Sequence, residues 1–192
     1  PAVCTQFPFL APDDWVVPTG NFPGAQTPDA YVARLKELYA QHTDWDTIPF
    51  ICWGYHPLWH GDQYRPQLTA LFPDKPVILW HRSFHELVCN DEALKWFGLT
   101  EAETKGKPET DWDRGHFWEN GAAALVAKLA AITCEPARYS KGMATFFGML
   151  HQAGITTALD MGIGVFGDPS GEAELIVKTA EAVAAPCRAI LT

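Results

Sequence analysis

The chain has 192 residues, which is enough for one ordinary domain with a substantial core. Apolar residues make up 47% and charged residues 19%, a composition typical of globular proteins rather than disordered ones. The formal net charge of −9, with no cluster of Lys and Arg, argues against a nucleic-acid-binding protein, because phosphate contacts require clustered cations.

Membrane insertion and disulfide bonding are not predicted either. No apolar run reaches the roughly 20 residues that span a bilayer, and the N-terminal stretch has neither the basic start nor the apolar length of a signal peptide. The five cysteines are scattered, odd in number and without CxxC spacing, which is typical of reduced thiols in a cytoplasmic protein. Cys52 and Cys89 lie in apolar stretches and are expected to be core thiols rather than nucleophiles.

The first half of the chain predicts an arm, two helices and two buried strands. Residues 1–27 are rich in Pro and Gly and predict an extended arm over the surface. Thr27 as N-cap and Pro28 in the first turn predict a helix that continues to residue 42. The apolar runs 48–55 and 76–80 predict strands buried on both faces, with a short helix between them.

The second half predicts alternating helices and strands. Asn90 or Asp91 can cap a helix that Gly98 ends, and a polar loop is expected over 99–115. A further helix is predicted over 118–132. From residue 136 onward the order is helix, strand, helix, strand, which is typical of βα units around a parallel sheet.

Two HxxxH pairs are the first candidates for chemistry: His56 with His60, and His81 with His85. On a helix such a pair can bind one zinc ion, whereas in an extended segment the two side chains stand about 13 Å apart. Three interpretations stay open: a metal site, a substrate pocket, or histidines at strand ends that satisfy backbone groups. Arg82 favours the pocket, because a guanidinium at the mouth of an apolar strand needs an anionic or carbonyl partner.

Two acidic residues are catalytic candidates. Glu119 follows Phe117 and Trp118 at a predicted helix start, where it could cap the helix or, desolvated by the two rings, act as a general base. Asp160 ends the predicted strand ITTALD and precedes a glycine-rich turn. It is either an ordinary turn residue or a site residue at the carboxyl end of a strand.

Four stretches resemble, in the same order, motifs of the amidohydrolase superfamily, in the branch that includes the N-substituted formamide deformylases. They are DDWVVPTG, WHRSFHELVCNDEALKWFGLT, GHFWENGA and GITTALDMG. The family's arginine–aspartate–glycine–histidine motif matches Arg82 to His85, with Ser83 and Phe84 in place of its aspartate and glycine. The asparagine of the following helix start matches Asn90.

Two further motifs extend the resemblance over nearly the whole chain. The family's glycine–x–x–x–glutamate element matches Gly115 to Glu119, and its aspartate before Met-Gly matches Asp160. The resemblance implies an α/β fold that is part of a metal-dependent hydrolase (β/α)8 barrel. Within one compact unit, residues 1–135 would form an N-terminal arm and an insertion that covers the active site. Residues 136–192 would form early βα units of the barrel.

The implied activity is hydrolysis of amide- or formamide-type C–N bonds in a small molecule. The resemblance implies a divalent metal, with zinc as the first candidate. This internal segment would not contain the full set of metal ligands, so the segment alone would be inactive. The implied substrate-binding residues are Arg82, His85, Trp53, His56 and Asn90. Glu119 and Asp160 would be catalytic, and Glu119 could also be a metal ligand. No nucleic acid or membrane partner is expected, and exposed strand edges would favour self-association.

Two alternatives of different classes stay open. The first is a standalone module that binds a small molecule in an aromatic pocket around Trp53, Trp59, Trp80 and Trp118. The second is a small zinc hydrolase in which the two HxxxH pairs bind the metal directly.

Overall fold

The computed structural model describes residues 3–45, 47–164 and 168–191, which form two compact units. The central unit comprises Pro8–Trp15 and Phe22–Leu125, and the terminal unit comprises Pro1–Phe7, Val16–Asn21 and Val126–Thr192. The boundary falls inside helix α6 (Glu119–Thr133), which was predicted over nearly the same residues.

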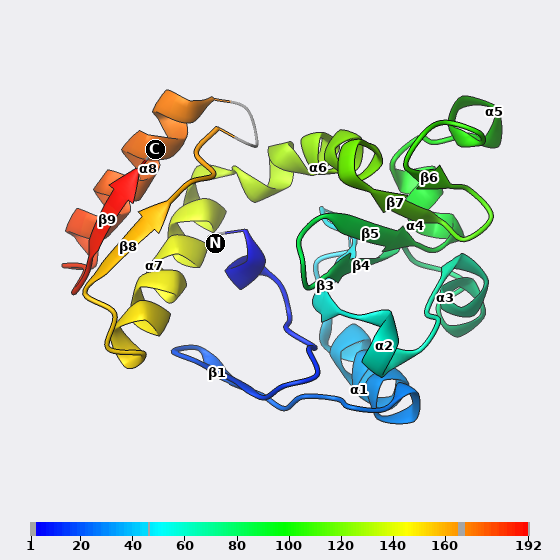
Figure 1. Cartoon of the computed structure of the whole chain (residues 1–192), viewed down its shortest axis with the longest axis horizontal. Helices are drawn as coiled ribbons and strands as arrows, with labels where there is room; N and C mark the ends of the chain where they lie inside the picture. Colours follow the sequence, from blue (N-terminus) through cyan, green and yellow to red (C-terminus); the bar gives the residue numbers. More distant parts are fainter. Residues whose placement is uncertain (1–2, 46, 165–167, 192) are drawn as a thin grey trace. The chain divides into compact units, whose positions relative to one another are not determined.

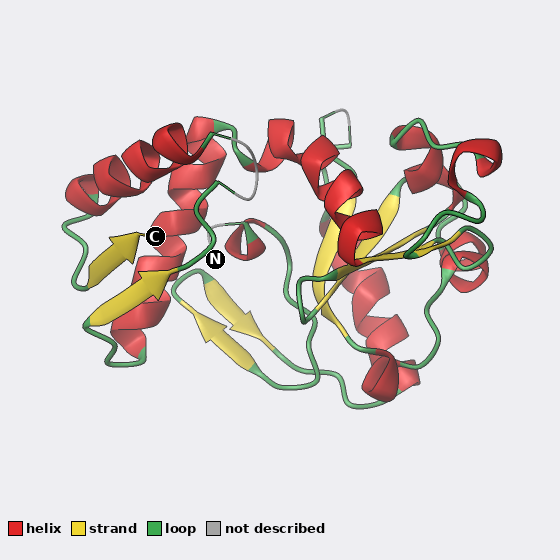
Figure 2. Ribbon diagram, turned by 45° about the horizontal axis from the view of Figure 1, so that its top comes forward, coloured by secondary structure: helices red, strands yellow, loops and turns green. Residues whose placement is uncertain are grey.

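The central unit is built on a five-stranded mixed sheet with the order β3-β4-β5-β7-β6 (Figures 1 and 2). The strands are β3 (Phe50–Tyr55), β4 (Val77–His81), β5 (Glu86–Cys89), β6 (Thr110–Asp111) and β7 (His116–Trp118). β3 and β4 are parallel and all other neighbours are antiparallel. The two predicted buried strands are therefore confirmed. The three shorter strands were not predicted, because runs of two to four residues leave little periodicity.

The helices of this unit that precede α6 are α1 (Pro28–Gln41), α2 (Pro57–His60), α3 (Arg65–Leu71), α4 (Asp91–Trp96) and α5 (Glu101–Thr104). The predicted cap of α1 is confirmed, because the Thr27 hydroxyl accepts a hydrogen bond from the Ala30 N–H at 3.3 Å. Of the two candidate caps of α4, Asn90 is the one used. The predicted loop over 99–115 is wrong in part, since α5 and β6 lie within it.

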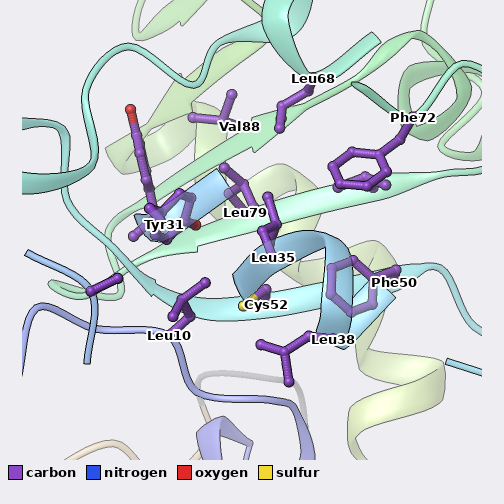
Figure 3. Close-up of a cluster of buried hydrophobic side chains, with 13 residues drawn as sticks. Leu10, Tyr31, Leu35, Leu38, Phe50, Cys52, Leu68, Phe72, Leu79 and Val88 are labelled. Carbon is purple, nitrogen blue, oxygen red and sulfur yellow. The ribbon is translucent and has the colours of Figure 1, made fainter. Parts of the chain in front are cut away.

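One face of the sheet packs against α1 and α3 (Figure 3). Leu35 and Leu38 of α1 and Leu68 of α3 are buried there against apolar side chains of β3, β4 and β5. Cys52 lies in this core and Cys89 is also fully buried, and burial raises the pKa of both thiols well above the ordinary value. Both cysteines are core thiols, as predicted.

The N-terminal stretch is not an arm over the surface, which corrects the prediction from its composition. Phe9 pairs with Trp53 beside the edge strand β3, and the Leu10 N–H donates to the Trp53 carbonyl at 2.8 Å. Leu10 is fully buried, and β1 (Trp15–Val17) pairs with β2 (Gly20–Phe22). The Pro and Gly residues set the turns, but the apolar side chains between them drive burial.

The terminal unit contains two βα repeats, as the order of its predicted elements indicated. Helix α7 (Pro136–Gln152), strand β8 (Thr157–Asp160), helix α8 (Pro169–Ala182) and strand β9 (Arg188–Leu191) follow one another. β8 and β9 are parallel. Their helix-covered face packs on a cluster that contains Tyr139, Met143, Phe147, Leu150 and Ile176.

The fold class is mixed α/β, as predicted, but a closed barrel is not confirmed. The strands of the residues that the structure describes form three sheets of two, five and two strands, each with open ends. No helix within the same residues combines the length and the apolar character needed to cross a membrane.

Candidate active site

Polar side chains gather in the central unit where β3 and β4 end. His56 follows β3 directly, and His81 is the last residue of β4. Because the two strands are parallel neighbours, their carboxyl ends meet at one edge of the sheet, and Tyr55 lies opposite His81 there. The loop 82–85 then leads into β5, so the motif HRSFH occupies this edge.

Phe84 holds this loop in a conformation that ordinarily belongs to glycine. Its φ is 74°, which is in the left-handed region and is unfavourable for a bulky residue. The Phe84 ring stacks on Trp80 with 4.4 Å between centroids, and the Trp80 Nε1–H donates to the Phe84 carbonyl at 3.1 Å. These contacts with Trp80 stabilise the turn in spite of the unfavourable backbone conformation.

Ser83 connects the histidines on either side of it. The His81 Nδ1 atom accepts a hydrogen bond from the Ser83 N–H at 3.1 Å and lies 2.7 Å from the Ser83 hydroxyl oxygen. That oxygen also accepts a hydrogen bond from the His85 N–H at 3.2 Å. Ser83 therefore fixes the backbone of His85 relative to the end of β4.

His85 and Glu119 form a dyad, defined here as the pair joined through His85 Nδ1 and Glu119 Oε2 at 3.2 Å. Their backbones are joined as well, since the Glu119 N–H donates to the His85 carbonyl at 3.0 Å. A carboxylate can only accept, so His85 donates through Nδ1 in this contact, and in the neutral ring that arrangement leaves the Nε2 lone pair available. The two side chains are 64% and 57% exposed, so Nε2 is accessible to a ligand.

Glu119 begins α6, as predicted, but it is not desolvated by Phe117 and Trp118. Phe117 is buried and its side chain lies on the opposite sheet face from Trp118, so the two rings cannot enclose the carboxylate. The backbone of Glu119 has φ 45°, which is again left-handed. Strained backbone of this kind is concentrated at functional sites in proteins, and here it occurs on both sides of the dyad.

The two HxxxH pairs do not form a metal site. HPLWH contains the single-turn helix α2 rather than an extended segment, because Pro57 is well suited to a first helical position. His56 caps this helix by accepting from the Leu58 N–H at 3.2 Å. His60 uses both ring nitrogens on backbone groups: Nδ1 accepts from the His56 N–H and Nε2 donates to the Ala25 carbonyl, each at 3.0 Å.

The buried neutral state of His60 predicts a pH-dependent stability. Burial lowers its pKa from 6.5 to about 4, so the unfolded chain binds a proton below pH 6.5 that the folded chain excludes. Stability should therefore fall by about 2 kcal/mol between pH 7 and pH 5 through this residue alone.

Urea unfolding followed by tryptophan fluorescence can measure this effect, because all eight Trp residues lie in the central unit. The His60→Gln variant should lose about 2 kcal/mol less than the unmodified chain between pH 7 and pH 5. Between pH 8 and pH 7 the two proteins should change alike. An equal loss of stability in both proteins between pH 7 and pH 5 would contradict the prediction.

Glu86 and His116 were not selected from the sequence, although they complete the polar edge. Glu86 Oε2 lies 2.8 Å from His116 Nε2, and Glu86 Oε1 lies 3.7 Å from His81 Nδ1. Burial lowers the pKa of His81, which opposes its protonation beside Glu86. The pairing of β5 with β7 places these residues on one face. They were missed because β5 and β7 are short strands far apart in the sequence, and no local signal indicates that they pair.

The predicted substrate-binding residues occupy different environments. Arg82 is 43% exposed, and its Nη1 atom is 4.0 Å from Asp13 Oδ2, so its guanidinium is accessible to a ligand. Trp53 lies among Phe9 and Trp15 in an aromatic cluster. Asn90 is fully buried and both ends of its amide bind backbone groups, so it has a structural role in the fold.

The four tryptophans of the alternative pocket do not line one surface. Trp53 and Trp80 are paired across β3 and β4 and share a face of the sheet. Trp118 is paired with Glu86 and lies on the other face, while Trp59 is exposed on α2. The structure therefore gives no support to an aromatic pocket made from all four.

Asp160 belongs to the terminal unit and ends β8, as predicted. Along this strand Ala158 and Asp160 are half-buried, whereas Thr157 and Leu159 are exposed. Since Ala158 packs on the cluster of α7 and α8, Asp160 lies on the helix-covered face. Its Oδ1 accepts a hydrogen bond from the Gly162 N–H at 3.0 Å, which is the turn role that the sequence left open.

The described residues do not fit a metal ion. Among residues 3–45, 47–164 and 168–191, no group of three or more His, Cys, Asp or Glu side chains is arranged to hold one. Glu119 therefore has no partner ligands from this part of the chain beyond its contact with His85.

Comparison with known proteins identifies a fold. No family model matches the chain, and neither does any curated protein. The structure is similar, with a TM-score of 0.61 and 15% identity, to an uncharacterized metal-dependent hydrolase from Pyrococcus horikoshii OT3. It is also similar, with a TM-score of 0.60 and 14% identity, to an uncharacterized metal-dependent hydrolase from Pyrococcus furiosus.

Both similarities cover 99% of this chain, but only 33% and 34% of the two hydrolases. The chain thus spans about a third of their length. At this level of identity the likeness establishes a shared fold over that third.

Proposed function

We propose that the chain is a segment of a metal-dependent hydrolase that cleaves amide- or formamide-type C–N bonds in a small molecule. The observation that carries the proposal is the shared fold, over 99% of the chain, with two proteins described as metal-dependent hydrolases. The resemblance of four ordered motifs to the amidohydrolase superfamily supports the C–N bond as the target. The metal would be held by residues other than those that the structure describes.

The terminal unit supports a barrel as the architecture of the complete protein. β8 and β9 are parallel strands joined through α8, and among the described residues neither has a second neighbour. Leu159 and Ile190 are paired on the uncovered face and are 53% and 46% exposed. In a (β/α)8 barrel, one face of the parallel sheet is covered by helices and the other carries apolar side chains that fill the barrel interior. The uncovered apolar face of β8 and β9 is what two strands of such a barrel would show without the others.

The dyad supports a role in proton transfer. With Glu119 holding the proton on Nδ1, the His85 Nε2 atom can take a proton from the water that attacks the carbonyl carbon. The carboxylate of Glu119 stabilises the imidazolium that results. His85 can then return the proton to the amine nitrogen as the C–N bond breaks, so that the dyad ends the reaction as it began, with a neutral imidazole and an ionised carboxylate.

Arg82 and His56 are the residues we place on the substrate side. Both lie at the same edge of the sheet as His81, and the exposed guanidinium of Arg82 can bind a carboxylate or carbonyl oxygen of the substrate. Asn90 is left out, because its amide is already bonded at both ends to the backbone. In this proposal Asp160 belongs to the turn after β8 and has no catalytic role.

An assay on N-formyl amines and simple amides tests this function. The complete polypeptide that contains these residues should release amine in the presence of Zn²⁺ or Mn²⁺, and a chelator should abolish the release until metal is restored. The 192-residue chain alone should release none under the same conditions. Hydrolysis by this chain alone would contradict the segment interpretation. If the complete polypeptide hydrolysed none of these substrates, the proposal that it is a hydrolase of C–N bonds would be contradicted.

A further inference from the structure

Glu109 lies near the dyad, although it belongs to the stretch 99–115, which was predicted to be a loop. It follows α5 and immediately precedes β6. Its φ is 60°, so it is the third residue near this site with left-handed backbone. Among the described residues other than glycine only four have this conformation: Phe84, Glu109, Glu119 and Ala184.

Two hydrogen bonds connect Glu109 to the residues on either side of Glu119. The Trp118 N–H donates to the Glu109 carbonyl at 3.0 Å, and the Asn120 N–H donates to Glu109 Oε2 at 2.8 Å. The main chain is thus fixed immediately before and immediately after Glu119. An ordinary helix cap comes from the residue that precedes the helix, whereas this one comes from eleven residues away.

Gly121 allows Glu109 to approach this closely. A Cβ atom at position 121 would lie 2.3 Å from the Glu109 carbonyl oxygen, a distance that real Cβ atoms do not adopt. Glycine in the first turn of a helix is otherwise unfavourable. The contact with Glu109 gives a physical reason for the glycine at this position.

We propose that Glu109 is a positioning residue, which holds Glu119 in its left-handed conformation and so directs the Glu119 carboxylate at His85. Only the hydrogen bond from the Asn120 N–H depends on the Glu109 side chain, since the other is made by its main-chain carbonyl. Without the side-chain bond the backbone at Glu119 would relax to the favoured negative φ, and the Glu119 side chain would leave the imidazole. Glu109 does not touch a reacting atom. It acts through Glu119, and its meaning for catalysis rests on the proposed function.

The tautomer of His85 reports this geometry without any assay of activity. In the chain as described, Glu119 places the proton on Nδ1, and long-range ¹H–¹⁵N spectra at neutral pH distinguish this form from the one protonated on Nε2. Glu109→Ala should shift His85 towards the Nε2-protonated form. Glu109→Gln keeps an oxygen acceptor for the Asn120 N–H and should retain the Nδ1-protonated form.

Two further variants separate positioning from stability. Gly121→Ala should produce the same shift as Glu109→Ala, by displacing Glu109 from the other side. Thr27→Ala removes the cap of α1 in the same unit and should lower the midpoint of unfolding without changing the tautomer.

An unchanged tautomer in Glu109→Ala would overturn the proposal, as would the same shift in Thr27→Ala. In the complete hydrolase, Glu109→Ala should lower kcat about 10- to 100-fold with little change in KM. If the tautomer shifts but no variant or parent hydrolyses any substrate, the proposed function fails and the positioning role stands. If hydrolysis is present and the tautomer of Glu109→Ala is unchanged, the positioning role alone fails.

Discussion

Replacing Glu119 by glutamine in the complete hydrolase should lower kcat by about 10²- to 10⁴-fold, the contribution typical of a positioned proton-transfer group. The glutamine side chain has a similar shape and can still accept from His85 Nδ1. It carries no charge, however, and therefore cannot stabilise the imidazolium that forms when His85 takes a proton from water. Steady-state kinetics on an N-formyl amine would measure the loss, with KM expected to change little.

Glu101→Gln is a matched control for this experiment. Glu101 is also the first residue of a helix, is also exposed, and contacts a basic side chain, with Lys105 Nζ at 2.8 Å from its Oε1. Its replacement should leave kcat unchanged. Because His85 and Glu119 act as one unit, the double variant of His85→Gln and Glu119→Gln should be no slower than His85→Gln alone. If the fold-losses in kcat of the two single variants multiplied in the double variant, the two residues would act independently and the dyad would be contradicted.

The elements that were predicted correctly carry their signals within a few neighbouring residues. Thr27 and Pro28 mark the start of α1, Asn90 caps α4, and the apolar runs of β3 and β4 are long enough to be recognised. The same holds for the βα order of the terminal unit. Local propensity and the final structure agree in these segments.

The dyad depends instead on a pairing that local signals do not contain. His85 and Glu119 are 34 residues apart, and they meet because β5 pairs with β7, strands of four and three residues. The family resemblance selected both residues separately, but not their contact. Phe84 shows a second limit, since a bulky residue in the sequence gives no indication of a left-handed turn.

For His60, by contrast, the role seen in the structure was one of the interpretations that the sequence left open. The sequence could not choose between a ligand and a histidine that satisfies backbone groups. Its environment decides, because both ring nitrogens are used and the ring stacks on Tyr31 with 4.0 Å between centroids. The start of α2 at Pro57 was a usable signal, but histidine is an uncommon N-cap and the helix has only four residues.

Replacing Asn90 by alanine should destabilise the central unit by about 4 kcal/mol, because one buried amide joins three segments of the backbone. Asn90 Oδ1 accepts from two N–H groups and Asn90 Nδ2 donates to two carbonyls, all at 2.8 to 2.9 Å. The four backbone partners belong to Val77, Ala93, Phe72 and Lys75. Alanine would leave these groups without hydrogen bonds in a buried place and would also remove the cap of α4.

Urea unfolding followed by tryptophan fluorescence would measure this change, since that signal reports the central unit. Thr27→Ala is the matched control, because it also removes a helix cap but only one long hydrogen bond at an exposed position. It should cost about 1 kcal/mol or less. If Asn90→Ala cost no more than Thr27→Ala, the amide would not be what holds β4, the turn after α3 and the start of α4 together. Its place in a substrate site would then have to be considered again.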